Sequence, residues 1–235
     1  TNTDPRPDDE LLQVDQRQYG GLRLVLGDTQ TRVHTYGDLR INVENPDPGV
    51  NGVDLWTDRT EAALLSTGGN IGMGSSSGSS PARFSVIAAE STIYGQGNNT
   101  NARNWVAETT ADGWLEFLAG DSIYTLGVSS AYEPDLLGST VSPARFYARE
   151  GDIYQLYYGY YGAIGTSLTL THQAGRPAHV RAGRDIVQYG DSRTAMGHYS
   201  DTDVSVIQAG RDLIYIDTQV VGAGTLELSA GRNFY

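Results

Sequence analysis

The residues of this chain best suited to chemistry are carboxylates that recur at similar places along the sequence. Asp121 and Asp152 each lie shortly before an isoleucine, in phrases of similar composition. Two carboxyl groups about 5–5.5 Å apart suit a retaining glycosidase, and a spacing of about 6.5–9.5 Å suits an inverting one. Asp also serves chain turns, because its side chain accepts hydrogen bonds from nearby backbone amides. We favour the turn role and keep catalysis by such a pair as an alternative.

Metal chemistry receives little support from the spacing of the possible ligands. The four histidines show neither His-x-His nor His-Glu-x-x-His spacing, and cysteine is absent, so zinc is not expected. The acidic groups at residues 8–10 and 201–203 could offer oxygen ligands to Ca²⁺, but neither forms an EF-hand loop. We therefore expect no catalytic residue, no metal and no cofactor.

Aromatic residues in three polar stretches are better candidates for a site. Residues 95–112, 125–142 and 155–175 are long excursions between repeated phrases, and each contains Trp or Tyr beside polar residues. Exposed aromatic side chains in loops often mark recognition surfaces. Consecutive tyrosines of a strand point to opposite faces, so packing between repeats is the alternative role for part of the set. The candidate recognition residues are Trp105, Tyr132, Tyr157, Tyr158, Tyr160 and Tyr161.

A repeated phrase indicates which elements must position these residues. Ala-Gly-Arg-Asp occurs at residues 182–185 and 209–212, and Ala-Gly-Arg-Asn at residues 230–233. An apolar residue, here called the marker, follows each copy, and looser copies lie upstream. Successive markers are 21 to 33 residues apart, and Leu55 divides the first gap in two, which leaves open an additional turn there. The markers are Leu39, Ile71, Ile93, Ile123, Ile153, Ile186, Leu213 and Phe234.

The sequence around the markers predicts β-strands. Apolar and polar residues alternate over residues 115–119 and 226–230, which is the period of a half-buried strand. Residues 61–65 are the best helical candidate and read equally well as a strand. Supersecondary units that repeat every 20 to 50 residues indicate a solenoid. Stacking would place the markers in an inward column and would place these residues in an outward one: Arg184, Arg211 and Arg232, beside Asp185, Asp212 and Asn233.

A second repeated phrase indicates where strands begin. Ser-Pro-Ala-Arg-Phe occurs at residues 80–84 and 142–146, and a weaker copy occupies residues 176–180. Proline is tolerated at the first residue of a strand, so each copy predicts a strand entry.

Composition excludes several classes of partner. The net charge is −12, and all 16 basic residues are arginines, so nucleic acid and anionic membranes are not expected partners. No run of apolar residues is long enough for a membrane-spanning helix. The chain begins without Met and ends directly after a turn phrase, so both ends read as cuts through a longer protein.

The Ala-Gly-Arg-Asp and Ala-Gly-Arg-Asn phrases resemble the repeats of the filamentous haemagglutinin family, most clearly over residues 178–235. These large exoproteins of two-partner secretion include adhesins and contact-dependent growth inhibition effectors involved in virulence. The resemblance implies a right-handed parallel β-helix, an outer-membrane transporter as partner, and a location outside the cell or on the bacterial surface. The family's shaft has no catalytic residues to transfer to this chain, whose repeats are longer and less regular.

We therefore expect an all-β, right-handed parallel β-helix with irregular loop insertions. Residues 1–18 would be a polar linker or N-terminal extension, and residues 19–235 a β-helix section of a longer exoprotein. The expected function is non-enzymatic recognition, in cell adhesion, of a receptor or glycan on host or neighbouring cells. The alternatives are a purely structural shaft and a β-helix polysaccharide lyase or glycosidase.

Overall fold

The regular structure of the described residues consists of parallel β-sheets. The computed structural model describes residues 22–26, 29–44, 61–73, 79–80, 83–95, 106–107, 114–130, 142–160, 176–189 and 194–235. Within these ranges every regular element is a strand, and no helix is long and apolar enough to cross a membrane. Residues 61–65 lie in a strand, which decides their ambiguous pattern. The predicted linker, residues 1–18, lies outside the described ranges.

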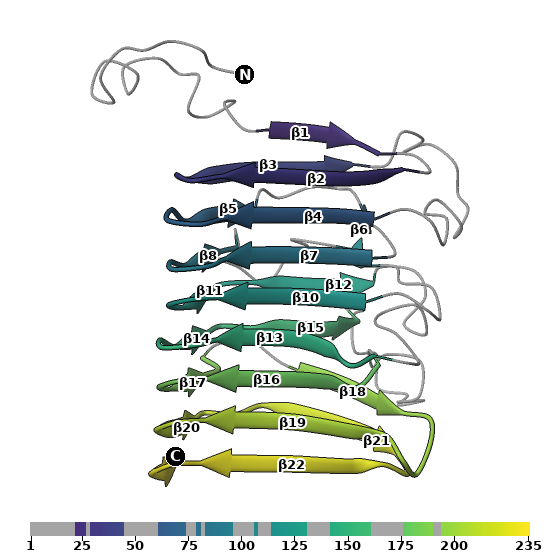
Figure 1. The fold of residues 1–235 in the computed structure, drawn as a ribbon. Helices are drawn as coiled ribbons and strands as arrows, with labels where there is room; N and C mark the ends of the chain where they lie inside the picture. Colours follow the sequence, from purple (N-terminus) through teal and green to yellow (C-terminus); the bar gives the residue numbers. More distant parts are fainter. Residues whose placement is uncertain are drawn as a thin grey trace.

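The longest strands form an eight-stranded sheet, here called sheet B. Its strands lie one below another along the whole stack (Figure 1). They are β2 (Gln30–Thr35), β4 (Glu61–Ser66), β7 (Arg83–Ala88), β10 (Trp114–Ala119), β13 (Ala144–Ala148), β16 (Ala178–Ala182), β19 (Val204–Ala209) and β22 (Thr225–Ala230).

Two further sheets take the strands that follow. Each sheet B strand leads through a short corner into sheet A, and most sheet A strands lead on into sheet C. We call the consecutive strands that contribute to the sheets in this way a rung. Sheet A contains β1 (Leu22–Val25), β3 (Leu39–Glu44), β5 (Ile71–Met73), β8 (Ile93–Tyr94), β11 (Ile123–Tyr124), β14 (Ile153–Tyr154), β17 (Ile186–Val187), β20 (Asp212–Ile214) and β23 (Asn233–Phe234). Sheet C contains β6 (Ser79–Ser80), β9 (Val106–Ala107), β12 (Gly127–Ser130), β15 (Tyr157–Tyr160), β18 (Thr194–His198) and β21 (Thr218–Gly222).

The predicted markers lie in register in sheet A. Each marker pairs with the next one along the sequence, from Leu39 opposite Ile71 to Leu213 opposite Phe234. The inward column is confirmed from Ile71 to Leu213, because these side chains are buried. Leu39 and Ile71 belong to directly paired strands, so no additional strand of sheet A separates them, and Leu55 itself lies outside the described residues.

Alternation in sheet B builds the rest of the core. Burial along β10 alternates between half-buried and buried, with Leu115, Phe117 and Ala119 facing inward. The rings of Phe117 and Phe146 stack with centroids 5.6 Å apart. Burying a large apolar side chain contributes about 1.5–3 kcal/mol, so inward residues repeated on each rung supply the main favourable term.

Strands do begin within the Ser-Pro-Ala-Arg-Phe phrases, at Arg83 for β7 and at Ala144 for β13, but the two copies are not in register. Phe84 lies opposite Leu115, whereas Phe146 lies opposite Phe117, two residues further along β10. Because strand side chains alternate with period two, a shift by two residues keeps both phenylalanines on the inner face. Both are fully buried.

Candidate functional site

The corner between sheets B and A is held by one column of polar side chains, here called the corner column. In the N-terminal rungs, Asp38 Oδ1 accepts the backbone N–H of Asn70 at 2.8 Å, and Asn70 Oδ1 accepts that of Thr92 at 3.2 Å. Asp38 and Asn70 therefore each satisfy a backbone donor one rung further on. The members directly precede the markers: Asp38, Asn70, Thr92, Ser122, Asp152, Asp185, Asp212 and Asn233.

The same contact continues in the C-terminal rungs. Ser122 Oγ accepts the N–H of Asp152 at 3.0 Å, and Asp152 Oδ1 accepts that of Asp185 at 3.0 Å. Asp185 Oδ1 accepts the N–H of Asp212 at 3.1 Å, and Asn233 Nδ2 donates to Asp212 Oδ1 at 3.1 Å. The Asp of the repeated phrase thus serves the turn, as its position predicted.

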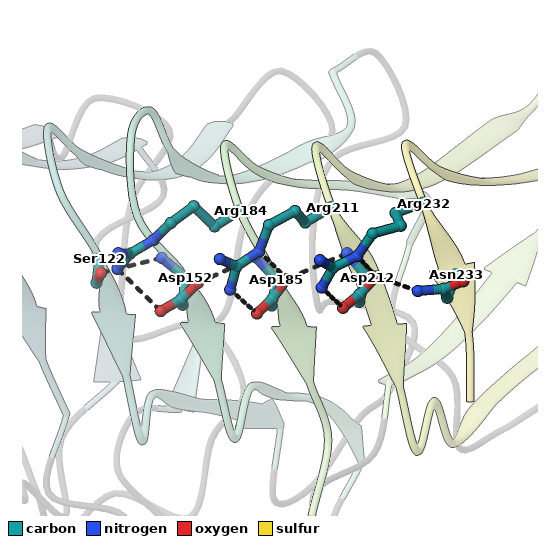
Figure 2. Close-up of polar contacts among 8 residues, drawn as sticks. All are labelled: Ser122, Asp152, Arg184, Asp185, Arg211, Asp212, Arg232 and Asn233. Atoms are coloured by element: carbon teal, nitrogen blue, oxygen red, sulfur yellow. Dashed lines mark hydrogen bonds and ion pairs between the residues drawn. The ribbon is translucent and has the colours of Figure 1, made fainter.

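The arginines of the phrase bind the carboxylate of the preceding rung (Figure 2). Arg184 Nη2 lies 3.0 Å from Asp152 Oδ2. Arg211 donates hydrogen bonds to both carboxylate oxygens of Asp185. Its Nε lies 2.9 Å from Oδ1, and its Nη2 donates to Oδ2. Arg232 binds Asp212 in the same bidentate way. The predicted outward column is therefore cross-linked from rung to rung.

These contacts change the acid–base properties of the column. The hydrogen bond from Arg211 holds the pKa of Asp185 below its ordinary value, against the opposing effect of burial. Arg232 lowers the pKa of Asp212 in the same way. Both carboxylates therefore stay ionised at a lower pH than an ordinary aspartate does. This suits a structural anion and opposes a role as proton donor.

The carboxylate pair considered for glycoside hydrolysis has other contacts. Asp152 binds Arg184 and the N–H of Asp185. Asp121 accepts the hydroxyl of Ser122 at 3.1 Å and that of Thr92 at 3.4 Å. A carboxyl group that acts on a glycosidic bond needs an open approach to the substrate, and the corner contacts already occupy the oxygens of Asp152.

The side chains of most of the predicted recognition residues lie outside the part of the chain that the structure describes. Trp105, Tyr132 and Tyr161 lie outside the described residues, and only the backbone of Tyr160 is described, within β15. Tyr157 is half-buried at the start of β15, and its N–H donates to the Leu126 carbonyl at 2.9 Å. Its role as a surface residue stays a prediction.

Tyr158 corrects the predicted surface. Its side chain is fully buried, its hydroxyl donates to the Arg176 carbonyl at 3.0 Å, and its ring meets Phe146 edge-on at 5.4 Å. Burial raises the pKa of this phenol. Alternation turns Tyr158 inward beside buried Val128, so it belongs to the core and not to a recognition surface.

A different surface, the outer groove, lies along the outside of sheet B at its corner edge. It encloses a volume of about 570 Å³. Its wall consists of outward-facing residues in register on five successive strands, one from each rung. The wall residues are Ile87, Leu118, Tyr147, Arg181 and Gln208.

Small corner residues form the floor of the outer groove. Ala89, Gly120, Gly183 and Gly210 line it beside the wall residues. A Cβ on Gly183 would overlap the carbonyl oxygen of Arg149, and one on Gly210 would overlap that of Gly183. Close stacking of the corners therefore requires glycine, and the missing side chains leave the trough open.

The charge of the outer groove is opposite to that of the whole chain. Arg149 and Arg181 line it, and no carboxylate of the described residues does, although the net charge is −12. Arg149 pairs with exposed Glu150 at 3.2 Å. The guanidinium of Arg181 lies over the Tyr147 ring, 5.6 Å from its centroid. Burial and the neighbouring Arg181 hold the pKa of His179 below its ordinary value.

The sequence patterns predicted neither the outer groove nor a column of tyrosines on sheet A. Tyr94, Tyr124 and Tyr154 follow three successive markers and form a column on sheet A. The rings of Tyr94 and Tyr124 are stacked at 5.7 Å, and those of Tyr124 and Tyr154 are tilted at 6.2 Å. The repeated Ile-Tyr dipeptide was the available signal. Because the rings face one another, inter-rung stacking accounts for this column.

The fold defines the class as an all-β protein of stacked parallel sheets. Nothing in the comparisons narrows this class: no protein-family model, no curated protein and no solved structure matches the chain.

Proposed function

We propose that the three sheets are the walls of a right-handed parallel β-helix. Parallel pairing of every adjacent strand and the order of strands in each sheet support this architecture. Right-handedness is favoured because the connection between parallel strands of one sheet is right-handed in about 98% of proteins. An experimental structure showing left-handed coils or separate sheets would contradict it.

The function we propose is recognition by a section of a secreted bacterial exoprotein similar to filamentous haemagglutinin. The observation that carries recognition is the outer groove, because wall residues from five rungs form one exposed, hollowed surface. Open surfaces of solenoids commonly bind extended ligands. The ligand would be a glycan or receptor on a host or neighbouring cell, and the chain would act without catalysis.

Secretion rests on the resemblance of the repeated phrases alone. An outer-membrane transporter would export the parent protein, which would reach the medium or the bacterial surface. Co-expression of the parent gene with a transporter gene from the same genome tests this. We expect surface exposure only with the transporter, and equal exposure without it would contradict two-partner secretion.

Two alternatives differ in what they bind and cleave. A structural shaft would bind no cell or glycan. A polysaccharide-degrading enzyme would cleave its ligand, but Asp152, Asp185 and Asp212 are held in corner contacts. Recognition is tested by incubating the labelled chain with bacterial and epithelial cells, before and after enzymatic removal of their glycans. We expect glycan-dependent binding without release of sugar fragments, and absence of binding to every cell type would support the shaft.

A further inference from the structure

We propose that the outer groove binds an extended polysaccharide carrying carboxylate groups, with Arg181 and Tyr147 as its main contacts. This inference rests on the proposed recognition function and names the site and the ligand class. The groove, rather than the predicted loops, would then hold the recognition residues.

The direction of the groove favours a polymer that runs from rung to rung. Its wall residues lie opposite one another on β7, β10, β13, β16 and β19, so the groove crosses the strands. Neighbouring strands of a sheet are about 4.8 Å apart, which is close to the length of one sugar unit. A polysaccharide lying there would meet one wall side chain for nearly every sugar.

The position on a sheet face disfavours a peptide. Peptides that add to sheets gain main-chain hydrogen bonds at an open strand edge. Along the outer groove the backbone groups of β10, β13 and β16 already pair with the strands on both sides. Binding there must use side chains, and stacking on Tyr147 with hydrogen bonds from Arg181 and Gln208 suits sugar rings and their hydroxyls.

Charge selects an acidic polymer. In the part of the chain that the structure describes, the residues lining the groove include Arg149 and Arg181 and no carboxylate. Arg149 is already paired with Glu150, whereas no described carboxylate forms an ion pair with Arg181. Its contact with the Tyr147 ring leaves the guanidinium able to bind a carboxylate through two parallel hydrogen bonds. The tyrosine also holds that guanidinium in place before the ligand arrives.

The test compares polygalacturonate, which carries a carboxylate on each unit, with its methyl ester, which keeps the sugar backbone without the charge. Calorimetry on the full chain should give binding to polygalacturonate that is at least about tenfold tighter than to the ester, equivalent to about 1.4 kcal/mol. Raising the salt from about 0.1 to about 1 M should weaken binding, because the charges are exposed. Equal affinity for the ester would overturn the role of charge.

Variants locate the site. Arg181→Gln and Tyr147→Ala should each weaken binding by at least about tenfold, with unchanged melting temperature as the check on folding. Arg32→Gln is the matched control, because Arg32 is exposed on β2 of the same sheet and lies outside the groove. An equal loss in Arg181→Gln and Arg32→Gln would show non-specific attraction and overturn the site.

A local readout comes from His179, which lies two residues before Arg181 on the outer face of β16. Burial lowers its pKa most, and Arg181 and Arg145 lower it further, while a backbone hydrogen bond at Val204 and the charge of Glu227 raise it. A bound carboxylate at Arg181 should raise the pKa of His179 in an NMR titration, and the methyl ester should not. An unchanged pKa at saturating polygalacturonate would place the ligand elsewhere.

Two outcomes separate this proposal from the function on which it rests. Cell binding that survives Arg181→Gln and Tyr147→Ala would overturn the groove and keep recognition. Absence of binding to any cell or glycan would overturn both. Polyglutamate binding as tightly as polygalacturonate would show that the groove takes acidic peptides instead, which also contradicts the proposal.

Discussion

The corners at the two ends of the described stack turn the chain at the same place but are held by different side chains. In the N-terminal rungs, Asp38 and Asn70 accept the next backbone N–H without an arginine in the column. In the C-terminal rungs, Asp152 and Asp185 make the same contact, and an arginine of the next rung binds each carboxylate.

This difference distinguishes the hydrogen-bond acceptor that the turn requires from the cation that stacked carboxylates require. Neutral Asn70, Thr92 and Ser122 occupy the column before Asp152, so those members do not repel one another. Carboxylates on successive rungs, about 4.8 Å apart, would repel unless a cation lay between them. The acceptor oxygen is therefore what the turn requires, and the arginine offsets the repulsion between carboxylates on successive rungs.

The largest effect should come from the glycine that lets C-terminal corners approach. Gly210→Ala should destabilise the fold by about 2 kcal/mol or more, because the new Cβ would overlap the Gly183 carbonyl. Gly37→Ala is the N-terminal counterpart, with no atom within 4 Å of its Cβ position. Urea denaturation should show a change within about 0.5 kcal/mol there. Similar losses at both positions would contradict the packing argument.

A smaller effect should separate oxygen from charge. Asp185→Ala removes the acceptor of the Asp212 N–H and the partner of Arg211, and it should cost about 1 kcal/mol. Asp185→Asn keeps one acceptor oxygen and should cost less stability. Asn70→Ala removes the acceptor of a backbone N–H and no charge, so its loss of stability should match the contribution that this hydrogen bond makes at both ends. Thermal unfolding measures all three. If Asp185→Asn is as damaging as Asp185→Ala, the charge holds the corner.

Lowering the pH should reduce the stability of the C-terminal corners, with a smaller effect than the substitutions above. The folded-state pKa values of Asp185 and Asp212 lie below their ordinary value, so their contribution is complete above about pH 4. It should disappear as the pH falls from there through the lowered folded-state pKa. The double variant Asp185→Asn, Asp212→Asn should flatten this decline in unfolding experiments across pH. An unchanged decline would assign it to other carboxylates.

The smallest effect should come from the exposed arginine itself. Arg211→Gln removes the ion pair but leaves Asp185 to accept the Asp212 N–H, so only a slight fall in melting temperature is expected at low salt. High salt should remove the difference, because exposed pairs are screened. A large loss that persists in high salt would make the arginine part of the turn.

Sequence reasoning succeeded where position repeated and failed where it did not. The markers could be aligned because each corner spans four or five residues from the last sheet B residue, as from Ala182 to Ile186 and from Ala88 to Ile93. The excursions share no such spacing, so their tyrosines could not be assigned to a face. Tyr158 was placed on the surface and lies in the core. The outer groove depends on wall residues from five rungs, which no local pattern connects.

The sequence by itself determined the strand period, the corners and the column of markers, because these follow from local alternation and short turns. Only the tertiary structure decided that Arg211 binds Asp185 of the preceding rung and not its own neighbour Asp212. It also decided that Arg181 meets Tyr147 above an open trough. The physical reason is parallel pairing, which brings residues about thirty positions apart to within one strand spacing of each other.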